Sequence, residues 1–334
     1  MNYRTHFLDF ENAFASPVTL WITVGIGVAL VLAPLVALGL GALGKLTAAT
    51  RRDVLVRSAT WAVIAPAVIG PILLGRGPTV LMVAAVSLWC YGEYARATGV
   101  FRDRVLSALV AMAIVALAFA SADNYYRMFV ATTPITMAAL AAAAVLRDTP
   151  AGYIQRVALS AMGFLLLGSG LGHLGLVTTD AKYRPLLCVL ILCVQINDIF
   201  AYCCGKAFGR RHLFPRTSPN KTLGGHLGAL VLTAPLAAWL LGIVLDGTPA
   251  GSVVHCIVMG VVISVGGQIG DLVLGSIKRD VGIKDMSATL PGHGGVLDRF
   301  NSMMLVAPAV YHYVAAVNGP FVGPEHVLLR LFRL

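Results

Sequence analysis

Charged side chains gather in one short segment, residues 276–302, of a chain that otherwise avoids charge. The segment is SIKRDVGIKDMSATLPGHGGVLDRFNS, whereas charged residues make up 12% of the 334 residues and hydrophobic residues 58%. Lysine and arginine side chains suit phosphate oxygens, and a glycine-rich stretch such as PGHGG lets the backbone approach a ligand closely. The segment therefore predicts a site for a phosphate-bearing ligand.

Two carboxylates interrupt apolar runs near their ends, Asp198 in LCVQINDIFAYCC and Asp271 in VGGQIGDLVLGS. A carboxylate at membrane depth is expensive unless it is paired or binds a metal. A packing contact between helices would explain both, but an ion or substrate site is the favoured interpretation. Together with Asp285 and Asp298, Asp271 offers the oxygen ligands that Mg²⁺ prefers when it joins one or two carboxylates to substrate phosphates.

A second basic segment, GRRHLFPRTSPNKT, precedes the first by about sixty residues. Its SPNKT portion combines a hydroxyl, a turn and a lysine in Ser218, Lys221 and Thr222. These groups also suit phosphate oxygens, although the pattern is not the GxxxxGK[ST] of a P-loop. Taken alone, such a loop is more often a topology determinant, so its weight comes from its combination with the aspartates.

Apolar runs long enough to cross a bilayer recur along the chain, and its mean hydropathy is +0.82. Soluble proteins carry about 25% charged residues, so the composition predicts an all-α polytopic integral membrane protein. The formal charge of +10 is explained by basic loops and anionic headgroups rather than by nucleic-acid binding. We expect about ten spans, at residues 18–44, 56–75, 78–97, 105–122, 126–146, 157–178, 185–204, 226–245, 252–276 and 302–317.

The basic residues divide unequally between the two sides of this arrangement. One set of alternate loops holds 18 Lys and Arg residues and the other side holds 7. By the positive-inside rule the first set, which includes both basic segments, faces the cytoplasm. We therefore expect an inner (plasma) membrane protein, bacterial in type.

The joint pattern K-R-x4-K-D-x-S-x2-L-P-x-H-G-G-V-x-D-R-F closely resembles the signature of the phosphatidate cytidylyltransferase (CDP-diacylglycerol synthase) family. NDIFAYCCGKAFG, SPNKT and the Gly-Asp pair at 270–271 resemble further blocks of that family. The resemblance is strong over roughly residues 185–315. It implies a variable helical region over residues 1–180 and a catalytic region over residues 181–334. The signature positions are Lys278, Arg279, Lys284, Asp285, Ser287, Leu290, Pro291, His293, Gly294, Gly295, Asp298 and Arg299.

The resemblance implies a reaction in which a phosphate oxygen of phosphatidate attacks the α-phosphorus of CTP, giving CDP-diacylglycerol and pyrophosphate. It implies Mg²⁺ held by Asp271 and Asp298. It implies substrate binding by Asp198, Ser218, Lys221, Thr222, Gly294 and Gly295. Catalytic roles fall to Lys278, Arg279, Lys284, Asp285, His293 and Arg299, and for His293 we expect a phosphate contact or structural support rather than proton abstraction.

Three positions depart from the family pattern. Asn301 stands where the family has Asp, Gly275 where it has Ser, and Gly224 where it usually has an acidic or amide residue. Asn301 still offers a carbonyl oxygen to a metal but lacks the charge. We therefore expect a weakened metal position, with Mn²⁺ or a second cation as alternatives to a single Mg²⁺.

Other functions stay open at this point. A weakened or repurposed paralogue would fit the departures, a CTP-dependent lipid kinase shares part of the loop chemistry, and a cation-coupled transporter would use carboxylates within the membrane. Membrane lipids are expected partners whichever function holds. Assembly as a homodimer is left undecided by the sequence.

Overall fold

Long helices make up nearly the whole of the computed structural model, which describes residues 7–146 and 148–319. Within these ranges nine helices are long and apolar enough to cross a membrane. They confirm the predicted all-α polytopic class. A tenth helix of similar length, α4, carries Arg76, Glu93 and Arg96 and is not among the nine.

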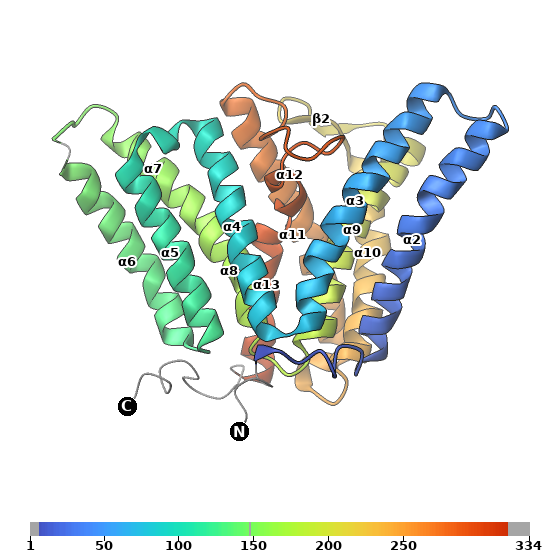
Figure 1. Ribbon diagram of the computed structural model, residues 1–334, viewed down its shortest axis with the longest axis horizontal. Coiled ribbons are helices and arrows are strands. Elements are labelled where there is room, and N and C mark those ends of the chain that lie inside the picture. The colour runs from blue at the N-terminus through green and yellow to red at the C-terminus, as the bar shows by residue number, and fades with distance from the viewer. Residues whose placement is uncertain (1–6, 147, 320–334) are drawn as a thin grey trace.

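The elements follow one another with short connections (Figure 1). In chain order they are α2 (Pro17–Ala42), α3 (Ala48–Leu74), α4 (Arg76–Thr98), η1 (Val100–Arg102), α5 (Arg104–Ala122), α6 (Tyr126–Val145), α7 (Tyr153–Gly163), η2 (Phe164–Gly170), α8 (Leu171–Val177), α9 (Tyr183–Phe208), β1 (His212–Phe214), β2 (Ser218–Thr222), α10 (Leu223–Val244), η3 (Pro249–Gly251), α11 (Val253–Asp280), α12 (Leu297–Phe300) and α13 (Met303–Asn318).

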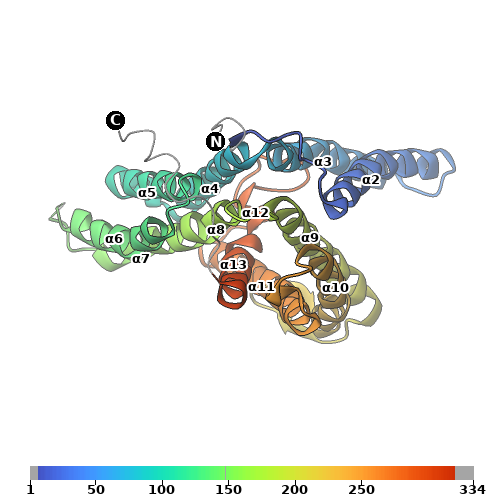
Figure 2. The same ribbon diagram turned by 90° about the horizontal axis from the view of Figure 1, so that it is seen from below.

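Two groups of helices meet at α13. The helices α9, α10 and α11 pack on one another in one group, α4 to α8 form the other, and α13 contacts both α11 and α8 (Figure 2). The helix α2 lies at the periphery, where only 11% of its most apolar window is buried by protein. Its uniformly apolar surface suits contact with lipid chains.

The loops with the larger share of basic residues all lie at the same end of the bundle. In Figure 1 the connections after α2, α4, α6, α9 and α11 are at the top. Four of the counted basic residues, Arg4, Arg147, Arg330 and Arg333, lie outside the described residues.

A short hairpin is the feature that the sequence did not predict. The strands β1 and β2 pair antiparallel between α9 and α10, with His212 opposite Thr222 and Phe214 opposite Ser218. Thr222 also caps the start of α10, where its side chain accepts a hydrogen bond from the Gly225 amide at 3.2 Å. This capping contact fixes the loop that carries Lys221 to the start of a helix.

Candidate active site

Two lysine–aspartate pairs bring the two basic segments together. Lys221 Nζ, at the end of β2, lies 2.5 Å from Asp271 Oδ2 on α11. Seven residues further along α11, which returns to nearly the same helix face, Lys278 Nζ lies 2.8 Å from Asp298 Oδ1 on α12. Positions far apart in the sequence thus form one cluster of alternating charge at the basic end of the bundle.

Asp298 is the more deeply held of the two carboxylates. Its side chain is 3% exposed, and its Oδ2 accepts hydrogen bonds from the backbone amides of Met286 and Gly295, both at 2.9 Å. With Lys278 these amides give it three donors, which compensates the charge for the loss of water. Asp298 therefore organises the loop as well as presenting charge.

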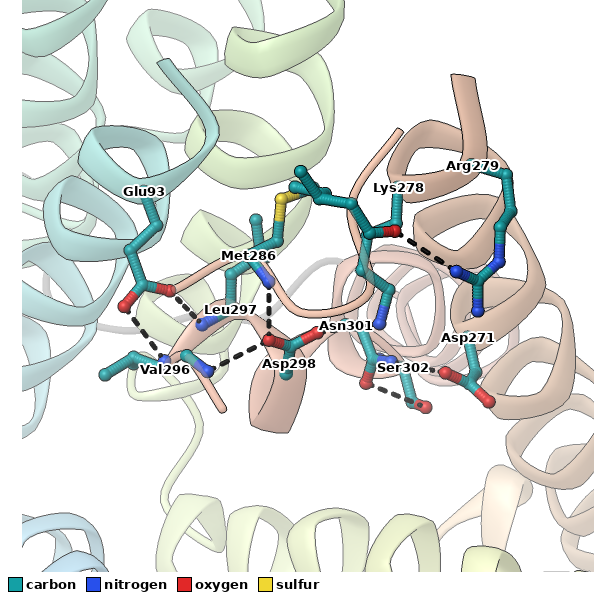
Figure 3. Close-up of polar contacts among 12 residues, drawn as sticks. Glu93, Asp271, Lys278, Arg279, Met286, Val296, Leu297, Asp298, Asn301 and Ser302 are labelled. Carbon is teal, nitrogen blue, oxygen red and sulfur yellow. Dashed lines mark hydrogen bonds and ion pairs between the residues drawn. The ribbon is translucent and has the colours of Figure 1, made fainter. Parts of the chain in front are cut away.

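Asn301 contacts the other carboxylate. Its Nδ2 donates to Asp271 Oδ1 at 2.7 Å, and its Oδ1 accepts from the Ser302 amide at 2.8 Å (Figure 3). The side chain is buried with the residue 6% exposed. This close approach depends on Gly270, because a Cβ at that position would lie 2.7 Å from the Asn301 carbonyl oxygen.

Asp198 and Arg299 lie within electrostatic reach of these pairs. Asp198, on α9, is exposed. It interacts electrostatically with Asp271, Lys221 and Arg299. The buried Nε of Arg299 has no hydrogen-bond partner among the described residues. A buried guanidinium N–H without a partner is the kind of group that an anionic ligand would satisfy.

The remaining basic-loop residues form the rim. Arg279 donates to the carbonyl oxygens of Thr217 at 3.4 Å and Ile283 at 3.2 Å, which ties the end of α11 to the hairpin. Lys284 and Asp285 are exposed, and Ser218 is half-buried on β2. Within the described residues, the side chains of Lys284 and Asp285 make no hydrogen bond or ion pair that would fix them.

The PGHGG turn is held by its own backbone and by α3. Gly292 and Gly294 have φ of 73° and 78°, values that glycine adopts without strain, and the Leu290 amide donates to the Gly294 carbonyl at 2.8 Å. His293 is buried against Trp61, with ring centroids 5.8 Å apart. Burial lowers the pKa of His293 below its ordinary value, and its Nδ1 lies 3.4 Å from the Pro291 carbonyl oxygen.

Glu93 of α4 is the site residue that sequence reasoning missed. Its carboxylate is fully buried and accepts from the Val296 and Leu297 amides at 3.1 and 2.9 Å (Figure 3). A Cβ at Gly295 would lie 2.4 Å from Glu93 Oε2, so the last glycine of GHGG is required by this contact. The signal was present in the sequence, because Glu93 interrupts an apolar run as Asp198 and Asp271 do.

The carboxylates of Asp271 and Asp298 suit a hard cation whose remaining ligands come from a bound substrate and water. Among residues 7–146 and 148–319 no group of three or more His, Cys, Asp and Glu side chains is arranged to hold a metal. Asp271 and Asp298 are each paired with a lysine instead. Mg²⁺ commonly binds through one or two carboxylates and takes its other ligands from phosphates and water, and that is the arrangement these two side chains could provide.

Comparison with known proteins places this site in a family. The model of the family described as "Cytidylyltransferase family" matches residues 55–317. The chain belongs to the cytidylyltransferase family. These enzymes are CTP-dependent nucleotidyltransferases, and the match includes α3 and α4 as well as the charged loops.

Individual relatives agree with this assignment. The cytidylyltransferase is 32% identical over 245 residues to the "Uncharacterized protein YnbB" of Escherichia coli, covering 72% of this chain and 80% of the relative. It is 38% identical over 151 residues to the phosphatidate cytidylyltransferase of Staphylococcus saprophyticus and 39% over 129 residues to that of Bacillus subtilis. These matches cover 42% and 38% of this chain, and 52% and 47% of the two relatives, so they span about half the length of each.

Proposed function

We propose that this cytidylyltransferase transfers the cytidylyl group of CTP to phosphatidate, giving CDP-diacylglycerol and pyrophosphate. The observation that carries the proposal is the convergence of two basic loops on Asp271 and Asp298 at one end of a bundle of apolar helices. Such a place suits the meeting of a water-soluble nucleotide with a lipid headgroup. The names of two relatives, each matched over about half its length, support phosphatidate as the lipid.

The charge of the reactants sets the chemical task. A phosphatidate oxygen attacks the α-phosphorus of CTP, the bond from that phosphorus to the bridging oxygen breaks, and pyrophosphate leaves with the electron pair. The attacking phosphate is already ionised at neutral pH, so no side chain has to remove a proton. The protein's contribution is to hold two polyanions together, which preorganised positive groups do at low cost during the reaction.

Lys221, Lys278 and Arg299 are the residues proposed for this work. Each lysine is held by an aspartate at 2.5 or 2.8 Å, and a phosphate oxygen could share or replace that partner. Arg299 offers its unpartnered Nε–H. Arg279 ties the loops together through backbone carbonyls, and Ser218 and Thr222 lie beside Lys221 in the hairpin strand.

Asp271 and Asp298 are the side chains that we propose to hold Mg²⁺, with Mn²⁺ and a second cation as variants of the same proposal. The ion would supply neutralisation of phosphate charge. Asn301 orients Asp271 by donating to it. Its own carbonyl oxygen is engaged by the Ser302 amide, so Asn301 would act on the metal through Asp271.

The same proposal places the site at the cytoplasmic face of a bacterial inner membrane. The larger number of basic residues at this end of the bundle supports the orientation. This orientation would also give the site access to both reactants, because a nucleoside triphosphate is available in the cytoplasm while the lipid stays in the bilayer.

Pyrophosphate release from CTP by purified protein with phosphatidate vesicles and Mg²⁺ tests the proposal. We expect release that depends on both substrates, formation of CDP-diacylglycerol, and loss of turnover in Asp271→Asn. The matched control is Asp246→Asn, an exposed aspartate that follows α10 at the opposite end of the bundle. Release of CDP would indicate a lipid kinase, and no reaction with CTP would contradict the proposal.

A further inference from the structure

The Glu93 carboxylate receives four hydrogen bonds, all from the segment that carries the family signature. Ser287 Oγ and Thr289 Oγ1 donate to Oε1 at 2.6 and 2.5 Å. The Val296 amide donates to Oε1 at 3.1 Å and the Leu297 amide to Oε2 at 2.9 Å. These donors lie about 200 residues away from Glu93 in the sequence.

The two backbone amides can only donate, one to each oxygen of Glu93, whereas the two hydroxyls can donate or accept; each oxygen therefore faces at least one group that needs an acceptor. Glu93 has no salt bridge to a lysine, arginine or histidine within the described residues, and its side chain is fully buried. The four donors therefore replace both water and a counter-ion. An amide in place of the carboxylate would turn an N–H toward at least one donor and leave a buried polar group unsatisfied.

The hydrogen bonds that Glu93 accepts fix the backbone directly before Asp298. Three consecutive amides are bound by two carboxylates: the Gly295 amide by Asp298, and the Val296 and Leu297 amides by Glu93. Asp298 follows directly and pairs with Lys278. Figure 3 shows the two carboxylates on opposite sides of this short stretch, with Glu93 reaching it from α4. A shift of this backbone would move Asp298 away from Lys278.

We propose that Glu93 is a positioning residue for cytidylyl transfer. It holds residues 287–297 so that the Asp298 carboxylate is correctly placed beside Lys278 and the substrates. The proposal rests on the proposed function for its kinetic part. It makes α4, from the first third of the chain, part of the apparatus that sets the reaction geometry. Thr60 of α3 supports the same loop by donating to the Pro291 carbonyl at 2.8 Å.

The test compares Glu93→Gln and Glu93→Asp with Glu11→Gln, which makes the same chemical change at an exposed glutamate far from the loop. Backbone hydrogen exchange is measured on metal-free protein in detergent, and pyrophosphate release is measured with substrates. In Glu93→Gln we expect exchange at residues 286–297 to accelerate about tenfold or more, the size expected for loss of a hydrogen bond to a charged group.

The kinetic constants separate positioning from stability. In Glu93→Gln we expect kcat to fall about tenfold or more while the KM for CTP changes less than about threefold, because the lysines that bind phosphate remain. Glu93→Asp keeps the charge but is one methylene shorter, so it should recover part of kcat. Glu11→Gln should match the unmodified protein in both measurements.

Unchanged exchange at residues 286–297 in Glu93→Gln would overturn the proposal, as would a lower melting temperature with unchanged kcat. If Glu93→Gln fails to fold, Ser287→Ala with Thr289→Ala removes two of the four donors and is expected to show the same effects in smaller degree; normal exchange and kcat in that variant would likewise refute the proposal. Absence of pyrophosphate release from the unmodified protein would contradict the proposed function, whereas the exchange measurement still decides whether Glu93 holds the loop.

Discussion

Replacing Asn301 by Asp tests the site at the position where the chain departs from its family pattern. The Asn301 Nδ2 donates to Asp271 Oδ1 at 2.7 Å, and the residue is 6% exposed. In Asn301→Asp this donor becomes a carboxylate oxygen, so a buried carboxylate faces that of Asp271, whose side chain is 32% exposed. Restoring the family residue should therefore destabilise the metal-free protein, although the two side chains are nearly the same size.

The hydrogen bond between Asn301 and Asp271 sets the size of the expected loss of stability in Asn301→Asp. A hydrogen bond to a charged group contributes about 1.5–3 kcal/mol. Two full charges at the separation found here would repel by about 6 kcal/mol at an effective dielectric constant of 20, and the ammonium group of Lys221 beside Asp271 offsets part of that repulsion. A net loss of about 2 kcal/mol follows, and at roughly 2–4 °C per kcal/mol the melting temperature should fall by about 5 °C.

Magnesium should reverse the loss, because a divalent cation between the two carboxylates turns their repulsion into a stronger site. The assays are thermal unfolding in detergent with EDTA or Mg²⁺, and the Mg²⁺ dependence of pyrophosphate release. We expect Asn301→Asp to melt lower only in EDTA and to reach half-maximal rate at a lower Mg²⁺ concentration. The control is Asn220→Asp, which adds the same charge at an exposed position on β2.

Two results would refute this reasoning. An unchanged melting temperature in EDTA would mean that the contact between Asn301 and Asp271 does not contribute to stability. A lower melting temperature that Mg²⁺ fails to restore, with half-maximal Mg²⁺ unchanged or higher, would mean that the pair does not face a metal.

Three further outcomes are expected. Lys278→Ala removes the ammonium group beside Asp298 and should lower kcat/KM by about tenfold or more, the loss of about 1.4 kcal/mol; unchanged kinetics would leave Lys278 a topological role. Gly295→Ala places a methyl group 2.4 Å from Glu93 Oε2 and should abolish turnover with a lower melting temperature, whereas normal activity would show that the contact is loose. A cysteine at exposed Ala288 should react with an impermeant reagent only after cells are permeabilised; labelling of intact cells would reverse the proposed orientation.

Much of the fold follows from the chain's own pattern. Runs of about 20 apolar residues can satisfy their backbone in a bilayer only as helices, so the spans and their approximate ends could be read without a structure. The predicted span at 252–276 and the helix α11 (Val253–Asp280), for example, differ by one residue at the start and four at the end. The ends are less certain because polar residues such as Lys278 and Arg279 continue the helix beyond the apolar run.

The sequence also indicated candidate residues for the chemistry. Charge is rare in this chain, so each charged residue inside or beside an apolar run stands out, as Asp271 and Lys278 do. The predicted span ended at residue 276 and left Lys278 in the following loop, whereas α11 continues to Asp280 and carries both residues on nearly the same face. The hairpin of β1 and β2 escaped prediction because its strands are three and five residues long, too short for a periodic pattern to appear.

Only the tertiary structure decided which groups are partners. No local pattern could show that Asn301 donates to Asp271, which lies 30 residues away in the sequence on α11, rather than to nearby Asp298. Nor could it show that Glu93 binds amides some 200 residues away. Helical periodicity fixes which face a side chain occupies, but the packing of one helix on another chooses its partner, and a buried carboxylate must find donors wherever that packing brings them.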